Sequence, residues 1–449
     1  MKVLHVVHGF LPESDGGVER YLEQILPAQR ARAHDVGVLT GSLVPWEQCG
    51  LERTSADGTP VIRLHRDDLF FDHHVKAWHP AVERLVADVF ARERPQLVHV
   101  HQWIRLTANL VEIAEATGCA TVVTLHDAYP TCPRVFRVDR DGRACNRPLS
   151  VASCLSCVPR YGHESDAELA EGIELFAAHT RSEVLRARAA VVASEATAAL
   201  LAGHLDVPRE RITVVPLPPA SRLPQRLPPV VVPPPPAPLR FGYFGALAPH
   251  KGVRVLVDAF ARLCAEPPGR PVELVLFGRD DEPGFAAELR AAAQGLPVAF
   301  AGRYDGATLA AAGLHCAVLP SLAFEGYGRV LDEAFELGLP VVVSDVGAPA
   351  ARAGAAGVRV PPGDPEALAR ALRALATEPD RLARMARAIP PPPPPLAAHV
   401  DALDAVYARA LATPPRTDAP AVDPLRRAAF VVRQRESALG RITPPGGPR

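Results

Sequence analysis

One stretch, residues 319–345, constrains the fold of this chain most. It reads LPSLAFEGYGRVLDEAFELGLPVVVSD. A strand end at Pro320 leads into a glycine-containing loop, then into helix-forming residues from Arg329 to Glu336. Gly338-Leu-Pro340 stops that helix before the apolar run Val341–Val343. The pattern predicts a strand, loop, helix and strand, the repeating unit of a parallel α/β sheet.

Two carboxylates of this unit fall where such folds bind ligands. Glu325 lies in the loop at the carboxyl end of the strand, and Glu333 lies on the helix, about two turns up. Ligands bind outside the carboxyl ends of the strands in open α/β sheets, where the N–H groups after Gly326 and Gly328 favour an anion such as a diphosphate. The two carboxylates can accept from vicinal hydroxyls of a sugar or ribose.

The flanking residues extend these glutamates into a longer pattern, P-S-x3-E-x2-G-x4-E-A-x3-G-x-P-V-V-x-S-D, from Pro320 to Asp345. It resembles glycosyltransferase family 4, whose members are retaining enzymes of the GT-B fold. The resemblance implies a nucleoside-diphosphate-sugar donor, with Glu325 on the sugar hydroxyls and Glu333 on the ribose. The donor-binding residues that it implies in this stretch are Glu325, Gly326, Tyr327, Gly328 and Glu333.

Size and proline content predict the domain organisation. A chain of 449 residues is too long for one ordinary core, and its 48 prolines cluster at 216–238 and 390–395. Proline runs cannot join the interior of a sheet or helix, so they indicate boundaries. We expect two Rossmann-like α/β domains that face a central cleft, with the acceptor site on the first and the donor site on the second, as the resemblance implies. The expected segments are residues 1–225, a linker at 226–238, the second domain at 239–389, a returning helix at 396–411 and a tail at 412–449.

Net charge and hydropathy limit the classes of partner and the location that we expect for this protein. The formal net charge of -1 gives no electrostatic case for nucleic acid. The apolar run at the amino terminus is broken by His5 and His8, unlike a signal-peptide core, and no run of about 18 apolar residues predicts a membrane span. We expect a cytoplasmic protein, and peripheral contact with a membrane that carries a lipid-linked acceptor is compatible with this expectation.

Two features of the first half are candidate site residues. Gly16 and Gly17 lie between the strand Lys2–Val7 and a predicted helix, so this loop can approach a ligand closely. The resemblance places them beneath the donor diphosphate. His126 ends the predicted strand that starts at Ala120, and its T-L-H-D-x-x-P context resembles the family's acceptor-domain histidine, which faces the transferred sugar. A purely structural role for this histidine is the alternative.

Lys251 precedes a predicted helix in the second half. A lysine there can reach a phosphate, supported by the helix amino terminus. Its context resembles the family loop G-x-L-x-x-x-K-G, which implies that Lys251 binds the donor diphosphate. The arginine often found after the first glycine is Ala246 here, so Arg279 or His250 is expected to supply the charge, or the diphosphate has fewer donors.

A second departure concerns the loop at Leu217-Pro-Pro219, where the family commonly carries Asn-Gly. This departure puts in doubt the interdomain ligand contact that the family normally makes there. Together with Ala246, it keeps a non-catalytic role open.

Four of the eight cysteines lie in the loop-rich stretch 130–160 with the spacing C-x12-C-x8-C-x2-C. Four thiolates can close a structural zinc site that orders such a loop. An iron-sulfur cluster and four unligated thiols are the alternatives. A four-thiolate site has no open position, so no catalytic metal is expected. No other catalytic cofactor is expected either. The four residues are Cys132, Cys145, Cys154 and Cys157.

These patterns together predict a hexosyltransferase-type retaining glycosyltransferase that acts on a sugar, lipid-linked or small-molecule hydroxyl, in polysaccharide, glycolipid or natural-product glycoside biosynthesis. His126, Lys251 and Glu325 are the predicted catalytic residues. One alternative is another GT-B enzyme of nucleotide sugars, a phosphorylase or an epimerase. The other is a non-catalytic scaffold that binds sugar nucleotides.

Overall fold

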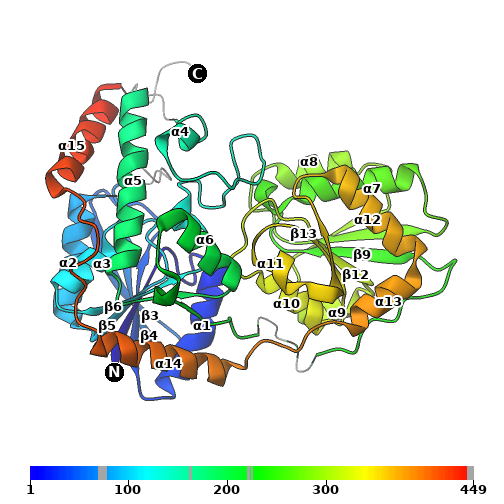
Figure 1. Ribbon diagram of the computed structural model, residues 1–449, viewed down its shortest axis with the longest axis horizontal. Coiled ribbons are helices and arrows are strands. Elements are labelled where there is room, and N and C mark those ends of the chain that lie inside the picture. The colour runs from blue at the N-terminus through cyan, green and yellow to red at the C-terminus, as the bar shows by residue number, and fades with distance from the viewer. Residues whose placement is uncertain (69–77, 161–163, 220–222, 224–225, 442–449) are drawn as a thin grey trace. The chain divides into compact units, whose positions relative to one another are not determined.

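The structure, a computed structural model, describes residues 1–68, 78–160, 164–219, 223 and 226–441 (Figure 1). The chain forms two compact units. The first contains residues 1–135 and 147–215 and the chain from Leu396 onward, and the second contains residues 136–146 and 216–395. The chain therefore passes from the first unit to the second after Val215. The sequence predicted this boundary after residue 225.

The described strands of the first unit form one sheet of order β3-β4-β2-β1-β5-β6-β7-β8, in which β3 alone runs antiparallel to its neighbour. Its strands are β1 (Lys2–Val7), β2 (Asp35–Gly41), β3 (Gly50–Ala56), β4 (Thr59–His65), β5 (Leu97–Val100), β6 (Ala120–Leu125), β7 (Ala189–Val192) and β8 (Ile212–Val214). Its helices are α1 (Gly17–Arg30), α2 (Pro80–Glu93), α3 (Leu110–Ala116), α4 (Val151–Cys154), α5 (Asp166–Arg186), α6 (Glu195–Leu205), α14 (Leu396–Ala412) and α15 (Pro424–Arg441).

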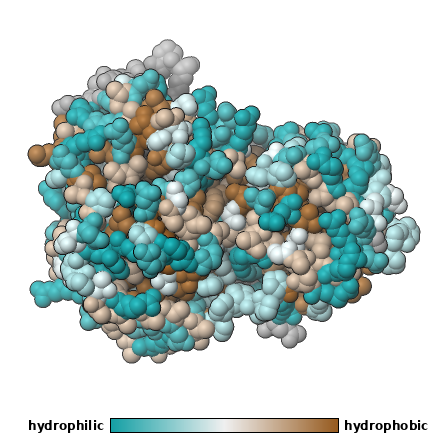
Figure 2. Space-filling model, viewed as in Figure 1, coloured by the Kyte–Doolittle hydropathy of each residue, from teal (hydrophilic) through white to brown (hydrophobic). Residues whose placement is uncertain are grey.

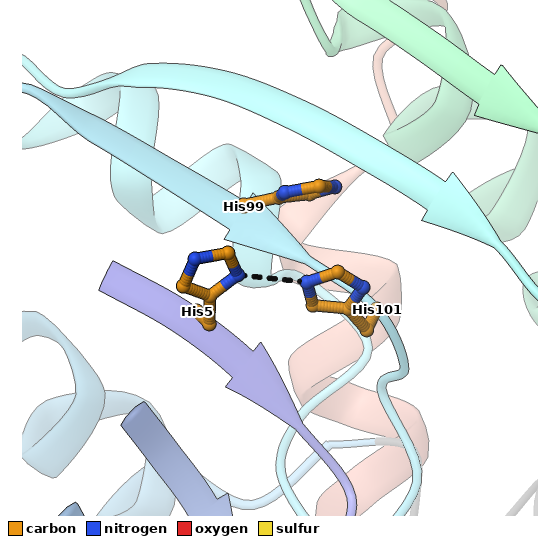
Figure 3. Close-up of side chains that lie close together, drawn as sticks. All are labelled: His5, His99 and His101. Carbon is orange, nitrogen blue, oxygen red and sulfur yellow. Dashed lines mark hydrogen bonds between the residues drawn. The ribbon is translucent and has the colours of Figure 1, made fainter. Parts of the chain in front are cut away.

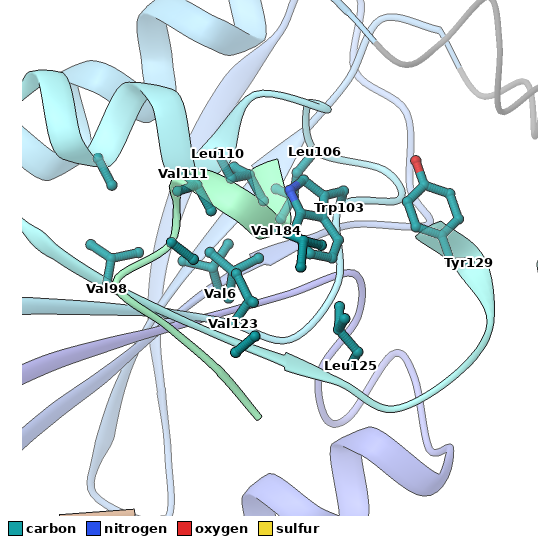
Figure 4. Packing of buried hydrophobic residues seen from close by; sticks show 14 of the residues in the cluster. Val6, Val98, Trp103, Leu106, Leu110, Val111, Val123, Leu125, Tyr129 and Val184 are labelled. Atoms are coloured by element: carbon teal, nitrogen blue, oxygen red, sulfur yellow. The ribbon is translucent and has the colours of Figure 1, made fainter. Parts of the chain in front are cut away.

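Side chains of the central strands β1 and β5 alternate between two different layers. Val6 and Val98 pack into the apolar core beneath α2 and α3, as the close-up shows (Figure 4). His5 and His99 point to the opposite face, where both are fully buried. Hydrogen bonds from this face reach side chains of α1 and α14. The period of two along each strand therefore separates an apolar layer from a polar, histidine-rich layer.

A buried carboxylate fixes the start of α3. Glu183 of α5 accepts from the backbone N–H groups of Val111 (2.7 Å) and Glu112 (3.0 Å) and from the Trp103 indole (2.9 Å). Burial raises the pKa of Glu183 to about 7, against the effect of these donors. The otherwise unpaired amides of the helix start are satisfied in this way.

In the edge hairpin β3–β4, the sequence predicts a strand near β4 but does not predict β3. Residues 52–55 of β3 are exposed and polar, so they lack the apolar run expected of a buried strand. Asp57-Gly58, a two-residue hairpin signal, joins the two strands. The turn chemistry was the only available indication of this strand.

The second unit contains a wholly parallel sheet of order β11-β10-β9-β12-β13-β14 among its described residues. Its strands are β9 (Leu239–Phe244), β10 (Val272–Phe277), β11 (Val298–Gly302), β12 (Cys316–Leu319), β13 (Val341–Ser344) and β14 (Gly357–Val360). Its helices are α7 (Val253–Ala265), α8 (Phe285–Ala292), α9 (Gly306–Ala311), α10 (Arg329–Glu336), α11 (Gly347–Arg352), α12 (Pro365–Thr377) and α13 (Pro379–Arg387). The predicted fold class, two Rossmann-like α/β units, is confirmed.

The proline-rich segment before β9 packs on the second unit. The amides of Leu227 and Val230 donate to the carbonyls of Glu336 (2.7 Å) and Gly338 (3.0 Å). A Cβ at Gly338 would lie 2.1 Å from the Pro228 carbonyl oxygen, so the absence of a side chain permits this approach. The end of α10 is thereby held by the linker.

The tail beyond α14, whose role the sequence left unread, contains a helix that packs on the first unit. In α15, the ring of Phe430 is buried beside Trp78 and Leu175. Arg426 and Arg433 pair with acidic residues of α5. No helix in the described part of the chain is long and apolar enough to span a membrane. On the face shown in Figure 2, hydrophobic residues are interspersed with hydrophilic ones.

Candidate functional site

Lys251 is positioned by a turn that is hydrogen-bonded to the loop after β12. The turn, Pro249–Lys251, precedes α7, and the amides of Leu322 and Ala323 donate to the His250 carbonyl (2.9 and 3.1 Å). Gly252 has a φ of +71°, and a Cβ there would lie 1.9 Å from the Pro320 carbonyl oxygen. Only glycine allows this approach, which sets the lysine beside the glutamate loop.

Glu325 and Lys251 form an ion pair at the carboxyl end of β12. The Lys251 Nζ lies 2.7 Å from Glu325 Oε1, and the Ser321 hydroxyl donates to the same oxygen (3.0 Å). Burial would raise the pKa of Glu325, but the charge and hydrogen bond of Lys251 and the bond from Ser321 outweigh it and hold the pKa below its ordinary value. Since both described donors reach Oε1, Glu325 Oε2 is left to accept from a ligand.

The backbone of Glu325 is fixed from the other side by α11. The Ala348 amide donates to the Glu325 carbonyl (2.9 Å). Gly347 has a φ of +67°, and a Cβ there would lie 2.6 Å from that carbonyl oxygen. The loop that carries the carboxylate is therefore clamped between two glycine contacts, at Gly252 and Gly347.

Glu333 lies on α10, half-buried, with the Tyr304 hydroxyl 3.4 Å from its Oε2. Burial raises its pKa from 4.5 to about 7, opposed by the charge of Arg329 and the bond from Tyr304. A carboxylate that exchanges a proton near neutral pH and has one long hydrogen bond is suited to accept from ligand hydroxyls.

The loop residues 326–328 can contact a donor through their backbone. The Tyr327 ring is buried beneath the Arg352 guanidinium, 3.7 Å from its centroid, and the Tyr327 hydroxyl donates to the Leu217 carbonyl (3.2 Å). Only the backbone of Tyr327 is therefore available for donor binding. Gly328 has a φ of +76° and caps α10.

Arg352 and Asp332 were not predicted from the sequence. Arg352 pairs with the buried Asp332 and donates to the Tyr327 carbonyl (2.8 Å), so it ties α11 to the donor loop. Their separation of 20 residues matches no local motif, and the order of the strands brings them together.

The two expected replacements for the missing arginine have different environments. Burial and the neighbouring Lys251 lower the pKa of His250 to about 4, so its ring is neutral near pH 7, stacked on Phe136 at 4.1 Å. Arg279 is exposed and pairs with Asp281.

In the first unit, Gly16 is the N-cap of α1 and Gly17 is its first residue. A Cβ at Gly16 would lie 2.7 Å from a carboxylate oxygen of the buried Glu19. The Ser14 hydroxyl donates to this carboxylate (2.6 Å), and His8 lies 3.6 Å from it. Glu19, which lies beneath the double glycine, was not predicted as a site residue, although glutamate in a first helical turn is a recognised signal.

His126 follows β6, at the carboxyl end of the strand. Its Nε2 lies 3.0 Å from His101 Nδ1, and its ring centroid lies 5.1 Å from that of Tyr21. His101 is two residues after His99 in the sequence. It connects His126 to the buried polar layer, where it is hydrogen-bonded to His5 (Figure 3). The structure thus gives His126 a defined orientation, and its contact with a sugar stays a prediction.

Two groups of described residues have ligand atoms close enough together to hold a metal ion, and the predicted cysteines belong to neither. In one, His5, His99 and His101 already use both ring nitrogens in hydrogen bonds. In the other, the Asp67 carboxylate accepts from both the Cys49 thiol and the His79 ring. Hydrogen bonding therefore accounts for both groups. The four-cysteine zinc site stays a prediction, with Cys145 in the second unit and the other three in the first.

Two Rossmann-like units, the second with a lysine, an acid pair and a glycine loop at the ends of its strands, define the GT-B class of glycosyltransferase fold. Sequence models of two families match consecutive parts of the chain: Glycosyltransferase Family 4 over residues 15–218, and Glycosyl transferases group 1 over residues 238–378. The chain belongs to glycosyltransferase family 4.

Two curated relatives are phosphatidyl-myo-inositol mannosyltransferases. That of Mycobacterium leprae (strain TN) is 41% identical over 137 residues, which is 28% of this chain and 34% of that protein. That of Mycolicibacterium smegmatis is 39% identical over 132 residues, 28% of this chain and 32% of that protein. The match thus spans about a third of the length of these relatives.

Solved structures share the fold over most of the chain. Anabaena HepE in complex with UDP has a TM-score of 0.58 at 18% identity, covering 91% of this chain and 100% of that one. Sucrose-phosphate synthase from Thermosynechococcus elongatus has a TM-score of 0.57 at 19% identity, covering 98% and 100%. At these identities the likeness establishes the fold.

Proposed function

We propose that this protein transfers a sugar from a nucleoside-diphosphate sugar to a hydroxyl acceptor, with retention of the anomeric configuration. The observation that carries the proposal is the ion pair of Lys251 and Glu325 at the end of β12, with Glu333 on the following helix. The lysine offers three N–H donors, of which one reaches Glu325. The others are suited to a diphosphate.

In the proposed reaction, the acceptor oxygen bonds to the anomeric carbon on the face from which the diphosphate leaves. The bond between that carbon and the diphosphate oxygen breaks, and the acceptor proton passes to the departing diphosphate. Lys251 and the amides of residues 326–328 stabilise the charge that develops there, which is the main source of rate acceleration in such sites. Glu325 accepts from sugar hydroxyls, Glu333 accepts from the ribose, and His126 positions the sugar.

The relatives suggest the classes of donor and acceptor. The HepE structure contains UDP, and the mycobacterial relatives are named for transfer of mannose to a phosphoinositide lipid. We propose a nucleoside-diphosphate hexose as donor and a glycan or lipid-linked hydroxyl as acceptor. A lipid acceptor would bring the protein to a membrane surface.

The first experiment measures thermal stabilisation by UDP, GDP and ADP, followed by transfer from the matching sugar nucleotides to water and to lipid or sugar acceptors. A ligand at 100 times its dissociation constant stabilises the folded state by about 2.7 kcal/mol. The anomeric coupling in the product's NMR spectrum reports retention or inversion. Stabilisation without transfer from any donor would favour the alternative of a non-catalytic scaffold that binds sugar nucleotides. Ala246 and the Leu217-Pro-Pro219 loop are the sequence features that favour this alternative.

Glu325→Gln tests the site directly, with Glu288→Gln on the exposed face of α8 as the matched control. We expect the first variant to lose transfer by about a hundredfold or more while it still binds the nucleoside diphosphate, because one donor or acceptor at the reacting centre is worth this much. The control should keep the parent activity. Equal transfer activity in both variants would show that Glu325 does not take part in the reaction.

A further inference from the structure

A short arm, residues 136–146, comes from the part of the sequence that otherwise forms the first unit, but it belongs to the second unit. A β-bridge and a bond from the Cys145 amide to the Arg137 carbonyl (2.7 Å) close the arm. The buried Arg137 side chain donates to the Cys145 carbonyl (3.0 Å). At the tip, the Asp139 carboxylate accepts from two backbone amides (2.9 Å each). The arm is therefore a small hydrogen-bonded hairpin.

Phe136, the first residue of the arm, contacts both loops of the lysine–glutamate ion pair. Its ring is stacked on the His250 imidazole, with the ring centroids 4.1 Å apart and the ring planes 4° apart. Its backbone carbonyl accepts from the Phe324 amide (3.0 Å). His250 directly precedes Lys251 in the sequence, and Phe324 directly precedes Glu325. One residue of the arm therefore contacts the chain neighbours of both site residues.

The backbone on both sides of Phe136 is left-handed. Val135 has a φ of +69° and Arg137 has a φ of +52°. The Cβ atom crowds the backbone in this region, and a β-branched residue such as valine is rarely found there. Residues in such conformations persist only where the surrounding contacts fix them, and they concentrate at functional sites. The contacts of Phe136 with His250 and Phe324 are suited to fix this segment.

The exposure of Phe136 indicates a role other than filling the core. Phe136 is 41% exposed, so its ring removes little apolar surface from water. Its stack on His250 holds the turn that carries Lys251 from one side. The His250 carbonyl, which accepts from the amides of Leu322 and Ala323, holds the same turn from the other side. Removal of the ring therefore takes away one of two contacts that fix the turn.

We propose that Phe136 is a positioning residue of the donor site, which holds the turn of Lys251 and the loop of Glu325 in place relative to each other. This inference rests on the proposed function, because it concerns the same ion pair. It deepens that function by assigning the arm to the donor site. In this role Phe136 acts through His250 and Phe324, and its contribution is the geometry of the two groups proposed to bind the diphosphate and the sugar.

The first test compares Phe136→Ala with Phe136→Tyr in the full chain. Alanine removes the stacked ring and tyrosine keeps it, while both keep the carbonyl that bonds to Phe324. The probe is UDP, GDP or ADP, whichever stabilises the parent, in titration calorimetry. We expect Phe136→Ala to bind it about tenfold more weakly, the effect of one hydrogen bond, and Phe136→Tyr to bind it like the parent. Equal affinity of Phe136→Ala and the parent would overturn the proposal.

A double-mutant cycle with His250→Ala shows whether Phe136 acts through the stack. In that case Phe136→Ala weakens nucleoside-diphosphate binding in the parent but hardly changes it in the His250→Ala background. Equal effects in both backgrounds would reject positioning through His250. Val231→Ala is the matched control, because Val231 is an exposed apolar side chain of the same unit and should bind the probe like the parent when shortened. Where Phe136→Ala does not fold, Phe136→Leu, which keeps apolar bulk without a planar ring, replaces it.

NMR titration of His250, assigned from His250→Gln, reports on the stack independently of activity. Burial and the charge of Lys251 lower the pKa of His250 to about 4. We expect Phe136→Ala to hydrate the ring and raise this pKa toward its ordinary value of 6.5, and Phe136→Tyr to leave it low. The same low pKa in Phe136→Ala would show that Phe136 does not cover His250, and the proposal would be wrong.

The outcomes separate this inference from the proposed function. Weaker nucleotide binding by Phe136→Ala, with a parent that transfers sugar from no donor, would reject transfer and support the positioning role. A parent that transfers sugar, with unchanged affinity and unchanged kcat/KM in Phe136→Ala, would support transfer and reject the positioning role. A parent that binds none of the three nucleoside diphosphates would overturn both.

Discussion

Lys251 Nζ lies 2.7 Å from Glu325 Oε1, and this pair joins the loops that follow the neighbouring strands β9 and β12 of the second unit. The Ser321 hydroxyl bonds the same carboxylate oxygen. The lysine holds the carboxylate ionised, and the carboxylate orients the lysine. A diphosphate that binds Lys251 therefore also adjusts the group proposed to hold the sugar.

Lys251→Met should weaken the affinity for a nucleoside diphosphate by about ten- to a hundredfold, because charge-assisted hydrogen bonds contribute about 1.5–3 kcal/mol. The measurement is titration calorimetry with UDP, GDP or ADP, whichever stabilises the parent. Arg254→Met on the exposed face of α7, where Arg254 pairs with Asp258, is the control and should bind like the parent. Equal loss in both variants would point to general charge and not to the site.

Glu333 should make stability and donor affinity depend on pH. Its carboxyl keeps its proton up to about pH 7 in the folded state, whereas the unfolded chain releases it near 4.5. The folded state binds more protons between these values, so the free energy of unfolding should fall as pH rises from about 4.5 to about 7, by up to about 1.4 kcal/mol per pH unit.

The check is urea unfolding of the parent and of Glu333→Gln between pH 5 and pH 8. The difference cancels the other titrating groups, and the variant should gain stability relative to the parent as pH rises. Donor affinity of the parent should increase through pH 7, as the carboxylate becomes a better acceptor, while that of the variant stays flat. Parallel pH curves for the two proteins would contradict the assignment.

The local part of the site could be predicted from the sequence. Lys251, Glu325 and Glu333 each lie at a strand end or helix start that glycine, proline and apolar runs mark within a few residues, and α10 was predicted with its observed bounds. The predicted boundary at residue 225 depended on proline content, which does not reveal that the linker pairs with Gly338.

The remaining partners are set by tertiary structure. Arg352 with Asp332, and Gln29 with Tyr407, meet because strand order and a returning helix bring distant segments together. No pattern within 20 residues carries this information. The alternation of His99 and His101 was visible in the sequence, but their connection to His126 required the neighbouring strands.

Arg352→Met should destabilise the protein by up to about 3 kcal/mol, because it leaves the buried Asp332 without its cation. The value lies at the low end for buried pairs since Arg352 is 23% exposed. Urea unfolding measures the loss, and the double variant with Asp332→Asn should recover part of it. No recovery would show that the Tyr327 contacts of Arg352, not the ion pair, dominate.

Gly347 and Gly354 allow a matched test of the clamp on Glu325. Both have positive φ, +67° and +50°, so alanine should cost about 1–2 kcal/mol of backbone strain at either position. A Cβ at Gly347 would lie 2.6 Å from the Glu325 carbonyl oxygen, whereas a Cβ at Gly354 would meet no described atom within 4 Å. The two substitutions thus differ in the contact with the donor loop.

Gly347→Ala should therefore displace Glu325 as well as lower stability, and we expect it to reduce transfer by at least tenfold at temperatures where both variants are folded, since small misplacements at a reacting centre have large effects on rate. Gly354→Ala should keep near-parental transfer despite similar strain. Thermal unfolding and initial-rate assays on the pair separate the two effects. If the variants lose transfer only in proportion to stability, the position of the Glu325 backbone does not limit the reaction.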